Sequence, residues 1–177
     1  EAISKLALEY GFNVVEDATH AIGGKYQGYP IGDCRYSDIT VFSFHPVKII
    51  TTGEGGMATT NNKKYSDQMR IFLSNGIAKD LKLFKFKKKK RPWYYEYQKT
   101  GFNYRMNEIS ASIGISQLSR LKKFLKKRNE IAKFYKKILD KLSIKYQKIN
   151  KYNFSSYHLF VVQFNLKRTK FSYLKMF

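Results

Sequence analysis

Apolar positions recur at helical spacing at the start of the chain. They are Ile3, Leu6, Ala7 and Tyr10. Gly11 follows as a helix C-cap, so the pattern predicts a helix over residues 1–10 that is already in progress where the sequence opens. The apolar, β-branched run at 12–15 then predicts a buried strand that ends at Glu16 and Asp17.

The next segments alternate between strand and helix patterns. Residues 23–33 are rich in glycine and predict turns or a short hairpin, while 39–44 and 56–60 read as strands. Residues 63–75 carry a helical stripe of apolar side chains that Gly76 ends. Alternation of this kind predicts an α/β fold with a mostly parallel sheet.

The second half of the chain contains one irregular stretch between regular patterns. Residues 79–100 are basic and aromatic without clear periodicity, which indicates a long excursion or lid. A long helix is predicted from 107 to about 128, continuing across a possible break to Leu139. The apolar run at 157–164 predicts a final strand.

The long helix is expected to lead from one domain into another. We assign residues 1–125 to a large domain and 126–177 to the start of a smaller one, both incomplete, so the chain is expected to be an internal fragment. Its 177 residues are 43% hydrophobic, which is enough for a packed core. No apolar run approaches the roughly 18 residues of a membrane span and no signal peptide is evident, which predicts no membrane partner and a cytoplasmic location.

The formal net charge of +21 raises the question of a nucleic-acid partner. The run Lys87–Arg91 fits that idea, but the remaining lysines are spread along the whole chain and no nucleic-acid-binding motif is present. We therefore predict no nucleic-acid partner. The single cysteine, Cys34, excludes an intrachain disulfide framework and a zinc site built from cysteines.

Candidate chemistry lies just beyond two predicted strands, where α/β sheets bind ligands. The residues there are Glu16, Asp17 and His20 after the first strand, and Ser43, His45 and Lys48 after the second. Apolar neighbours of Lys48 favour a neutral, nucleophilic amine that can form a Schiff base, although it could equally be one more surface lysine. Asp17 could instead be a helix N-cap or a solvated carboxylate.

Several other kinds of site find little support in the sequence. His20, His45 and His158 lack a metal-binding motif such as HExxH, so no metal site is predicted. The glycines of TTGEGG match neither phosphate-loop frame and read as turn residues. Ser43 lacks the GxSxG elbow of a hydrolase.

Three segments, in order, resemble the DegT/DnrJ/EryC1/StrS sugar aminotransferases, which use pyridoxal phosphate (PLP). They are VVEDATHAIGGKYQGYPIG at 14–32, SDITVFSFHPVKIITTGEGGM at 37–57 and GFNYRMNEISASIGISQL at 101–118. The resemblance covers about residues 1–165. It implies the fold of type I PLP-dependent transferases, similar to aspartate aminotransferase, with helices on both faces of the sheet.

The resemblance also implies roles for five residues. Lys48 matches the lysine that binds PLP covalently and moves the proton, and Asp17 matches the carboxylate that pairs with the pyridinium nitrogen. His20 matches the contact to the ring oxygen and Ser43 a phosphate-binding serine. Asn103 matches a residue that reaches the phosphate in the neighbouring subunit, which implies a homodimer.

The implied reaction is a two-stage transamination from L-glutamate. Within the family, the resemblance is strongest to members that act in pseudaminic acid biosynthesis, so the implied acceptor is the C4 ketone of a UDP-linked 4-keto-6-deoxy-N-acetylhexosamine. Another 4-keto sugar on UDP, dTDP or GDP stays open. So do a regulator that binds PLP without turnover and a non-catalytic basic binding protein. Residues 79–100 are expected to cover the sugar nucleotide, with Trp93 or Tyr94 near the sugar or base.

Overall fold

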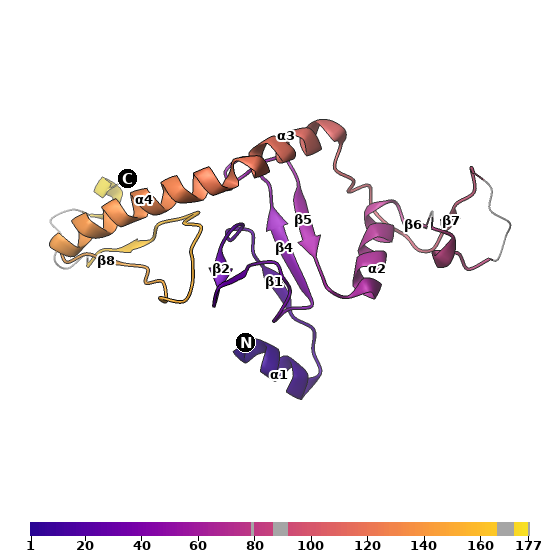
Figure 1. The fold of residues 1–177 in the computed structure, drawn as a ribbon, viewed down its shortest axis with the longest axis horizontal. Coiled ribbons are helices and arrows are strands. Elements are labelled where there is room, and N and C mark those ends of the chain that lie inside the picture. The colour runs from indigo at the N-terminus through magenta and orange to yellow at the C-terminus, as the bar shows by residue number, and fades with distance from the viewer. Residues whose placement is uncertain (79, 87–91, 166–171, 177) are drawn as a thin grey trace.

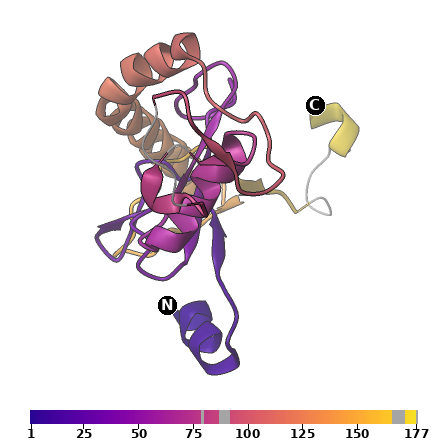
Figure 2. The same ribbon diagram turned by 90° about the vertical axis from the view of Figure 1, so that its right-hand side faces the viewer.

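The computed structural model describes residues 1–78, 80–86, 92–165 and 172–176. A small sheet lies at its centre, and two consecutive helices, α3 and α4, form a long rod along one side (Figures 1 and 2). The elements in chain order are α1 (Ala2–Tyr10), β1 (Val15–Asp17), β2 (Lys25–Tyr26), β3 (Tyr29–Pro30), β4 (Ile39–Ser43), β5 (Gly56–Thr59), α2 (Lys63–Leu73), β6 (Ile77–Ala78), the 3₁₀ turn Leu81–Leu83, β7 (Glu96–Tyr97), α3 (Glu108–Ser119), α4 (Leu121–Lys141), β8 (Lys145–Tyr146), β9 (Val162–Gln163) and α5 (Tyr173–Met176).

The first predicted helix is confirmed, and the strand after it is shorter than predicted. Gly11 ends α1 in the left-handed conformation, with φ 70°, and its N–H donates to the Ala7 carbonyl at 2.9 Å. Strand β1 covers only Val15–Asp17, and the prediction that it is buried is wrong, because Val15 is 62% exposed. Among the described residues β1 is an edge strand that pairs with β4 alone, so little covers it.

The central sheet has the order β1-β4-β5. Strands β1 and β4 are parallel, with Val15 opposite Ile39 and Asp17 opposite Val41, which agrees with the parallel pairing predicted. Strand β5 is antiparallel to β4, with Ser43 opposite Gly56. A connection without a crossover helix can return only to an antiparallel position, so the turn after β4 fixes this direction.

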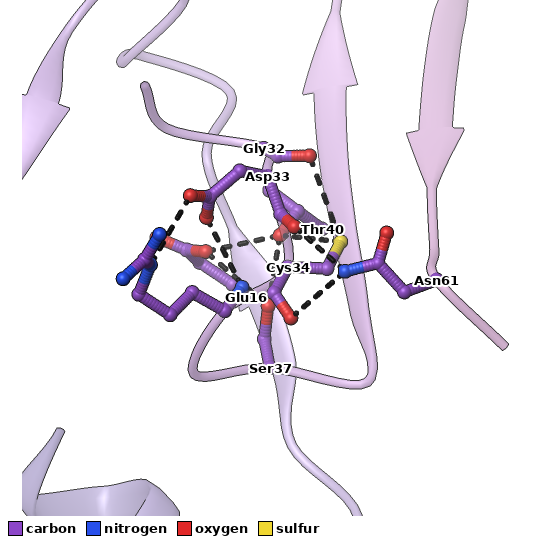
Figure 3. A network of polar contacts seen from close by, with 8 residues as sticks. Glu16, Gly32, Asp33, Cys34, Ser37, Thr40 and Asn61 are labelled. Atoms are coloured by element: carbon purple, nitrogen blue, oxygen red, sulfur yellow. Dashed lines mark hydrogen bonds and ion pairs between the residues drawn. The ribbon is translucent and has the colours of Figure 1, made fainter. Parts of the chain in front are cut away.

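A polar network locks β1 against β4 (Figure 3). The Thr40 hydroxyl, in a fully buried residue, donates to Glu16 Oε2 at 3.0 Å and lies 2.9 Å from the Ser37 hydroxyl. The Cys34 thiol donates to the Thr59 carbonyl at 3.2 Å, which extends the network to β5. Because neighbouring residues of a strand point to opposite faces, tying down Glu16 directs Asp17 to the other face.

The glycine-rich segment forms the predicted hairpin. Strands β2 and β3 are antiparallel, and both turn residues, Gln27 and Gly28, have positive φ, as hairpin turns require. Two backbone hydrogen bonds between Lys25 and Phe154, of 2.8 and 2.9 Å, join the hairpin to the distant segment before β9.

The long helical pattern is confirmed, but the break lies at Arg120, between α3 and α4, and not after residue 128 as predicted, because α4 runs without interruption from Leu121 to Lys141. Helix α4 runs without interruption through residue 125, the predicted domain boundary, and the division into domains stays a prediction. The final strand predicted at 157–164 is wrong except for Val162–Gln163, which pairs with β8. The carbonyls of Ser155, Tyr157 and His158 accept hydrogen bonds from side chains of α4 instead of from a strand.

The predicted excursion is partly organised around one buried carboxylate. Glu96 of β7 accepts hydrogen bonds from the Lys85 and Phe86 N–H groups, at 2.7 and 3.2 Å, and from the Tyr94 hydroxyl and the Gln98 amide, both at 3.0 Å. Burial alone would raise the pKa of Glu96, but these hydrogen bonds outweigh it and lower the pKa. The basic run at 87–91 lies outside the described residues.

Buried side chains gather at the carboxyl end of β4. Phe44, Ile49 and Ile50 are at most 6% exposed, and they lie on either side of Lys48 in the sequence. The candidate chemistry therefore lies beside buried side chains.

Within the described ranges, no helix is both long and apolar enough to cross a membrane.

Gly55 closes the turn between β4 and β5, and we predict that Gly55→Ala destabilises the fold by about 3 kcal/mol. Its φ of 154° suits glycine, and an added Cβ would collide with the Thr52 hydroxyl and lie 2.8 Å from Met106 Cε. Gly53→Ala is the control, because Gly53 has φ 80° and open space around it. It should cost about 1 kcal/mol, the left-handed penalty alone. Urea denaturation measures both, and equal losses would contradict the steric argument.

Candidate active site

Lys48 lies in a tight turn that is anchored on both sides. The Phe44 carbonyl accepts from the Thr51 hydroxyl at 2.9 Å and from the Thr52 N–H at 3.0 Å, which closes the loop around the lysine. Within it, the Lys48 N–H donates to the His45 carbonyl at 2.9 Å. With Ile49 buried next to it and the side chain of Lys48 half-buried, the amine has a fixed base and a partly shielded position.

Ser43 is the last residue of β4 and begins this turn. Its hydroxyl accepts a hydrogen bond from the His45 N–H at 3.3 Å, which caps the strand end. The side chain is half-buried. A hydroxyl at a strand end beside a run of turning backbone is well placed to bind an anionic group.

Asp17 and His20 lie at the carboxyl end of β1. The Ala18 N–H donates to the Val41 carbonyl at 2.9 Å, so the pairing with β4 continues past Asp17. The Thr19 N–H donates to Asp17 Oδ1 at 3.0 Å. The hydrogen bonds from Thr19, and after them the charges of His20 and Lys48, hold the pKa of Asp17 below its ordinary value.

The structure therefore brings three of the five predicted residues close enough for their charges to act on one another. Asp17 interacts with both His20 and Lys48, although β1 and the lysine turn are separate segments of the chain. Ser43 belongs to the same end of the sheet through β4. An ionised carboxylate, an amine and a histidine are thus gathered at one edge, as the parallel pairing of β1 and β4 led us to expect.

His158 is a member of this cluster that the sequence analysis considered only as a metal ligand. Its ring lies against the His20 ring, with centroids 4.2 Å apart and planes inclined at 44°. Burial, followed by the charges of His20, Lys48 and Arg128, lowers its pKa. A histidine interrupting the apolar run YHLFVVQF was the one signal in the sequence, and without the fold it pointed to no partner.

The segment that carries His158 is held by α4. Arg128 donates through one guanidinium nitrogen to the Tyr157 carbonyl at 3.0 Å and, more weakly, to the His158 carbonyl at 3.5 Å. The Asn129 amide donates to the Ser155 carbonyl at 3.1 Å. Two neighbouring residues of one helix thus set the position of the histidine.

Asn103, the fifth predicted residue, lies elsewhere. It forms an isolated bridge with Ser74 beside the end of α2, and its side chain is exposed. Over the described ranges, no hydrogen bond or ion pair joins it to the four residues above. Its predicted role toward a neighbouring subunit stays a prediction.

Two hollows in the surface lie away from this cluster. One of about 460 Å³ lies between α1 and the β2–β3 hairpin, and one of about 810 Å³ lies between that hairpin and α4. Neither is lined by Asp17, His20 or Lys48. In the part of the chain that the structure describes, no group of three potential metal ligands comes together.

The donor set suits PLP. A carboxylate that stays ionised is the partner that a pyridinium nitrogen needs, and a half-buried amine nearby is the group that reacts with an aldehyde. The Ser43 hydroxyl lies at the strand end where a phosphate can bind. In addition, Nδ1 of His158 is buried and has no hydrogen-bond partner among the described residues.

Comparison with known proteins agrees with this chemistry. The sequence profile of the DegT/DnrJ/EryC1/StrS aminotransferase family matches residues 1–176. The UDP-4-amino-4,6-dideoxy-N-acetyl-beta-L-altrosamine transaminase of Campylobacter jejuni (serotype O:23/36) is 38% identical over 163 residues, which are 92% of this chain and 40% of that protein. The chain spans about two fifths of the length of the curated relatives it matches.

Solved structures show the same likeness. Helicobacter pylori PseC, an aminotransferase involved in the biosynthesis of pseudoaminic acid, superposes with a TM-score of 0.80 at 30% identity, covering 94% of this chain and 42% of PseC. The PLP form of the sugar aminotransferase Spr1654 from Streptococcus pneumoniae has a TM-score of 0.71 at 29% identity, covering 85% and 36%. The arrangement around the sheet is therefore one that solved aminotransferases share.

We predict that Arg128→Ala lowers the free energy of unfolding by about 2 kcal/mol, because it removes charged hydrogen bonds to the segment that carries His158. Lys127→Ala is the matched control. The Lys127 side chain is 72% exposed and its ion pair with Glu130 is long, at 3.7 Å, so the change should stay below about 0.5 kcal/mol. Thermal or urea denaturation measures both, and equal effects would count against a special role of Arg128.

The lowered pKa of His158 predicts a specific pH dependence of stability. The unfolded chain takes up the His158 proton at a higher pH than the folded chain, so stability is complete above the ordinary histidine pKa and is lost as the pH falls below it. His158→Phe removes this loss. Urea denaturation at pH 7.5 and pH 5 should show a smaller drop for the variant than for the wild type, and equal drops would refute the assignment.

Proposed function

Because the chain belongs to the DegT/DnrJ/EryC1/StrS aminotransferase family, whose members are PLP-dependent sugar aminotransferases, we propose that the protein containing it transfers an amino group to a nucleotide-linked sugar. The observation that carries this proposal is the convergence of Asp17, His20 and Lys48 at the carboxyl ends of two paired strands. A family resemblance alone would not require these three side chains to interact. Their interaction is what the proposed chemistry needs.

Each residue has a definite task in this proposal. When bound, PLP supplies an aromatic ring that withdraws electrons from the substrate carbon. The ionised carboxylate of Asp17 would hold a proton at the ring nitrogen, and its lowered pKa keeps it ionised at neutral pH and somewhat below. Ser43 would bind the phosphate, and His20 would contact the ring oxygen.

Lys48 would bind the cofactor covalently and act as the proton carrier. One Nζ can serve both purposes because it is released when the amino donor takes its place, and it can then move a proton at the substrate carbon. The closed backbone around Lys48 fixes the base from which this side chain extends.

The substrates follow from the relatives. We propose L-glutamate as donor and, as acceptor, the C4 ketone of a UDP-linked 4-keto-6-deoxy-N-acetylhexosamine, because of the likeness to the altrosamine transaminase and to PseC. The excursion ordered by Glu96 would cover the sugar nucleotide, with Trp93, 71% exposed, free to contact it. We also propose that the protein is a cytoplasmic homodimer, in which Asn103 reaches the site of the partner subunit. The boundary between the two domains is proposed to lie at residue 125.

The test is covalent trapping. We expect that the purified protein, incubated with PLP, reduced with borohydride and digested, carries a pyridoxyl group on Lys48 by mass spectrometry. Lys48→Arg should lose the adduct while keeping the positive charge, and Lys25→Arg, in the β2–β3 hairpin, should keep it. A folded wild-type protein without an adduct on Lys48 would refute the proposal.

Amino-transfer assays with the same protein preparation distinguish the possible acceptors. Amino transfer from L-glutamate to the UDP-linked 4-keto sugar supports the proposed substrate. Faster transfer to a dTDP- or GDP-linked 4-keto sugar would show that this sugar is the acceptor instead. An adduct on Lys48 without transfer to any of these sugars would indicate a PLP-binding regulator.

A further inference from the structure

His158 reaches the candidate site from a part of the chain far from it in sequence. Its ring centroid lies 4.2 Å from that of His20, and the planes are inclined at 44°. The two rings are therefore close neighbours in a tilted arrangement, and rotation of His20 toward this side would bring it against His158. No other described ring is paired with His20.

The position of His158 is fixed by its own neighbours. Arg128 donates to the carbonyls of Tyr157 and His158, and the Asn129 amide donates to the Ser155 carbonyl at 3.1 Å. Ser156, two residues before His158, is 2% exposed. A ring mounted on backbone that two neighbouring residues of α4 hold has a defined position.

Charge around His158 favours its neutral form. The groups that act on it are His20, Lys48 and Arg128, all of which can carry positive charge, and the nearby carboxylate of Asp17 interacts with His20 and Lys48. A second positive histidine beside Lys48 would repel the ammonium group. Burial acts in the same direction, and Nδ1 lacks a hydrogen-bond partner over the described ranges.

We propose that His158 is a positioning residue: its ring, on a segment whose backbone is held by side chains of α4, keeps the His20 ring in the orientation that contacts PLP. This inference rests on the proposed function, since it gives His20 a cofactor to contact. It assigns a role in the site to a residue in the second half of the chain. It also makes the orientation of His20 dependent on where α4 lies.

Two substitutions distinguish the contribution of the aromatic face of His158 from that of its ring nitrogens. His158→Phe keeps an aromatic face against His20 and cannot be protonated, whereas His158→Gln keeps a polar group and loses the face. We expect His158→Gln to weaken PLP binding about tenfold, and His158→Phe to bind PLP within about twofold of wild type. Titration of PLP into the apoprotein, followed by its absorbance, measures both without requiring turnover.

The pH profile supplies a second readout that a merely structural role would not move. Wild-type affinity for PLP should fall as the pH drops from 7.5 to 5, because protonation of His158 adds positive charge next to Lys48 and His20. In His158→Phe this fall should be smaller. Tyr157→Phe is the matched control, because it removes the hydrogen bond with Lys136 on the adjacent residue and leaves the pair of histidine rings intact.

The outcomes are distinct. Wild-type affinity and wild-type pH response in both His158 variants would overturn the role of His158 and leave the proposed function standing. So would a loss of affinity in Tyr157→Phe as large as that in His158→Gln, since general loosening of the segment would then explain both. A folded wild-type protein that binds no PLP would overturn the proposed function itself.

Discussion

The pairing of β1 with β4 is the interaction on which the rest of the candidate site depends. It is only three residue pairs long, yet it is fixed from one face by the hydrogen bonds among Glu16, Ser37 and Thr40. Because side chains alternate along a strand, anchoring Glu16 on that face directs Asp17 to the other. A slip of one residue would turn Asp17 to the opposite face, away from Lys48.

A second constraint comes from the carbonyl of Phe44. It accepts two hydrogen bonds from the chain beyond Lys48, and so it turns the chain back toward β5 and places the lysine at the tip of the turn. Buried apolar neighbours secure the turn on both sides. The backbone of Lys48 is thus held by hydrogen bonds and buried neighbours, which is the support that the role proposed for its amine requires.

Helix α4 connects the remainder of the chain to this site. It is strongly basic, yet its contacts to the site are made by Arg128 and Asn129, whose side chains bind the backbone of residues 155–158. The many other lysines of the helix point largely to solvent. On α4, therefore, most of the positive charge lies at the surface, and a few hydrogen-bonded side chains make the contacts to the candidate site.

The sequence alone determined much of the local structure and named the candidate residues. Helical spacing ending at Gly11 predicted α1, and position after two strands, together with the family resemblance, singled out Asp17 and Lys48, because these signals depend on neighbours in the chain. Only the tertiary structure showed that 157–160 is not a strand and that His158 lies against His20. An apolar run is typical of a strand, but here side chains of α4 donate hydrogen bonds to carbonyls of the run, which a strand would use for pairing. Ring contacts between distant residues leave no periodic pattern in a sequence.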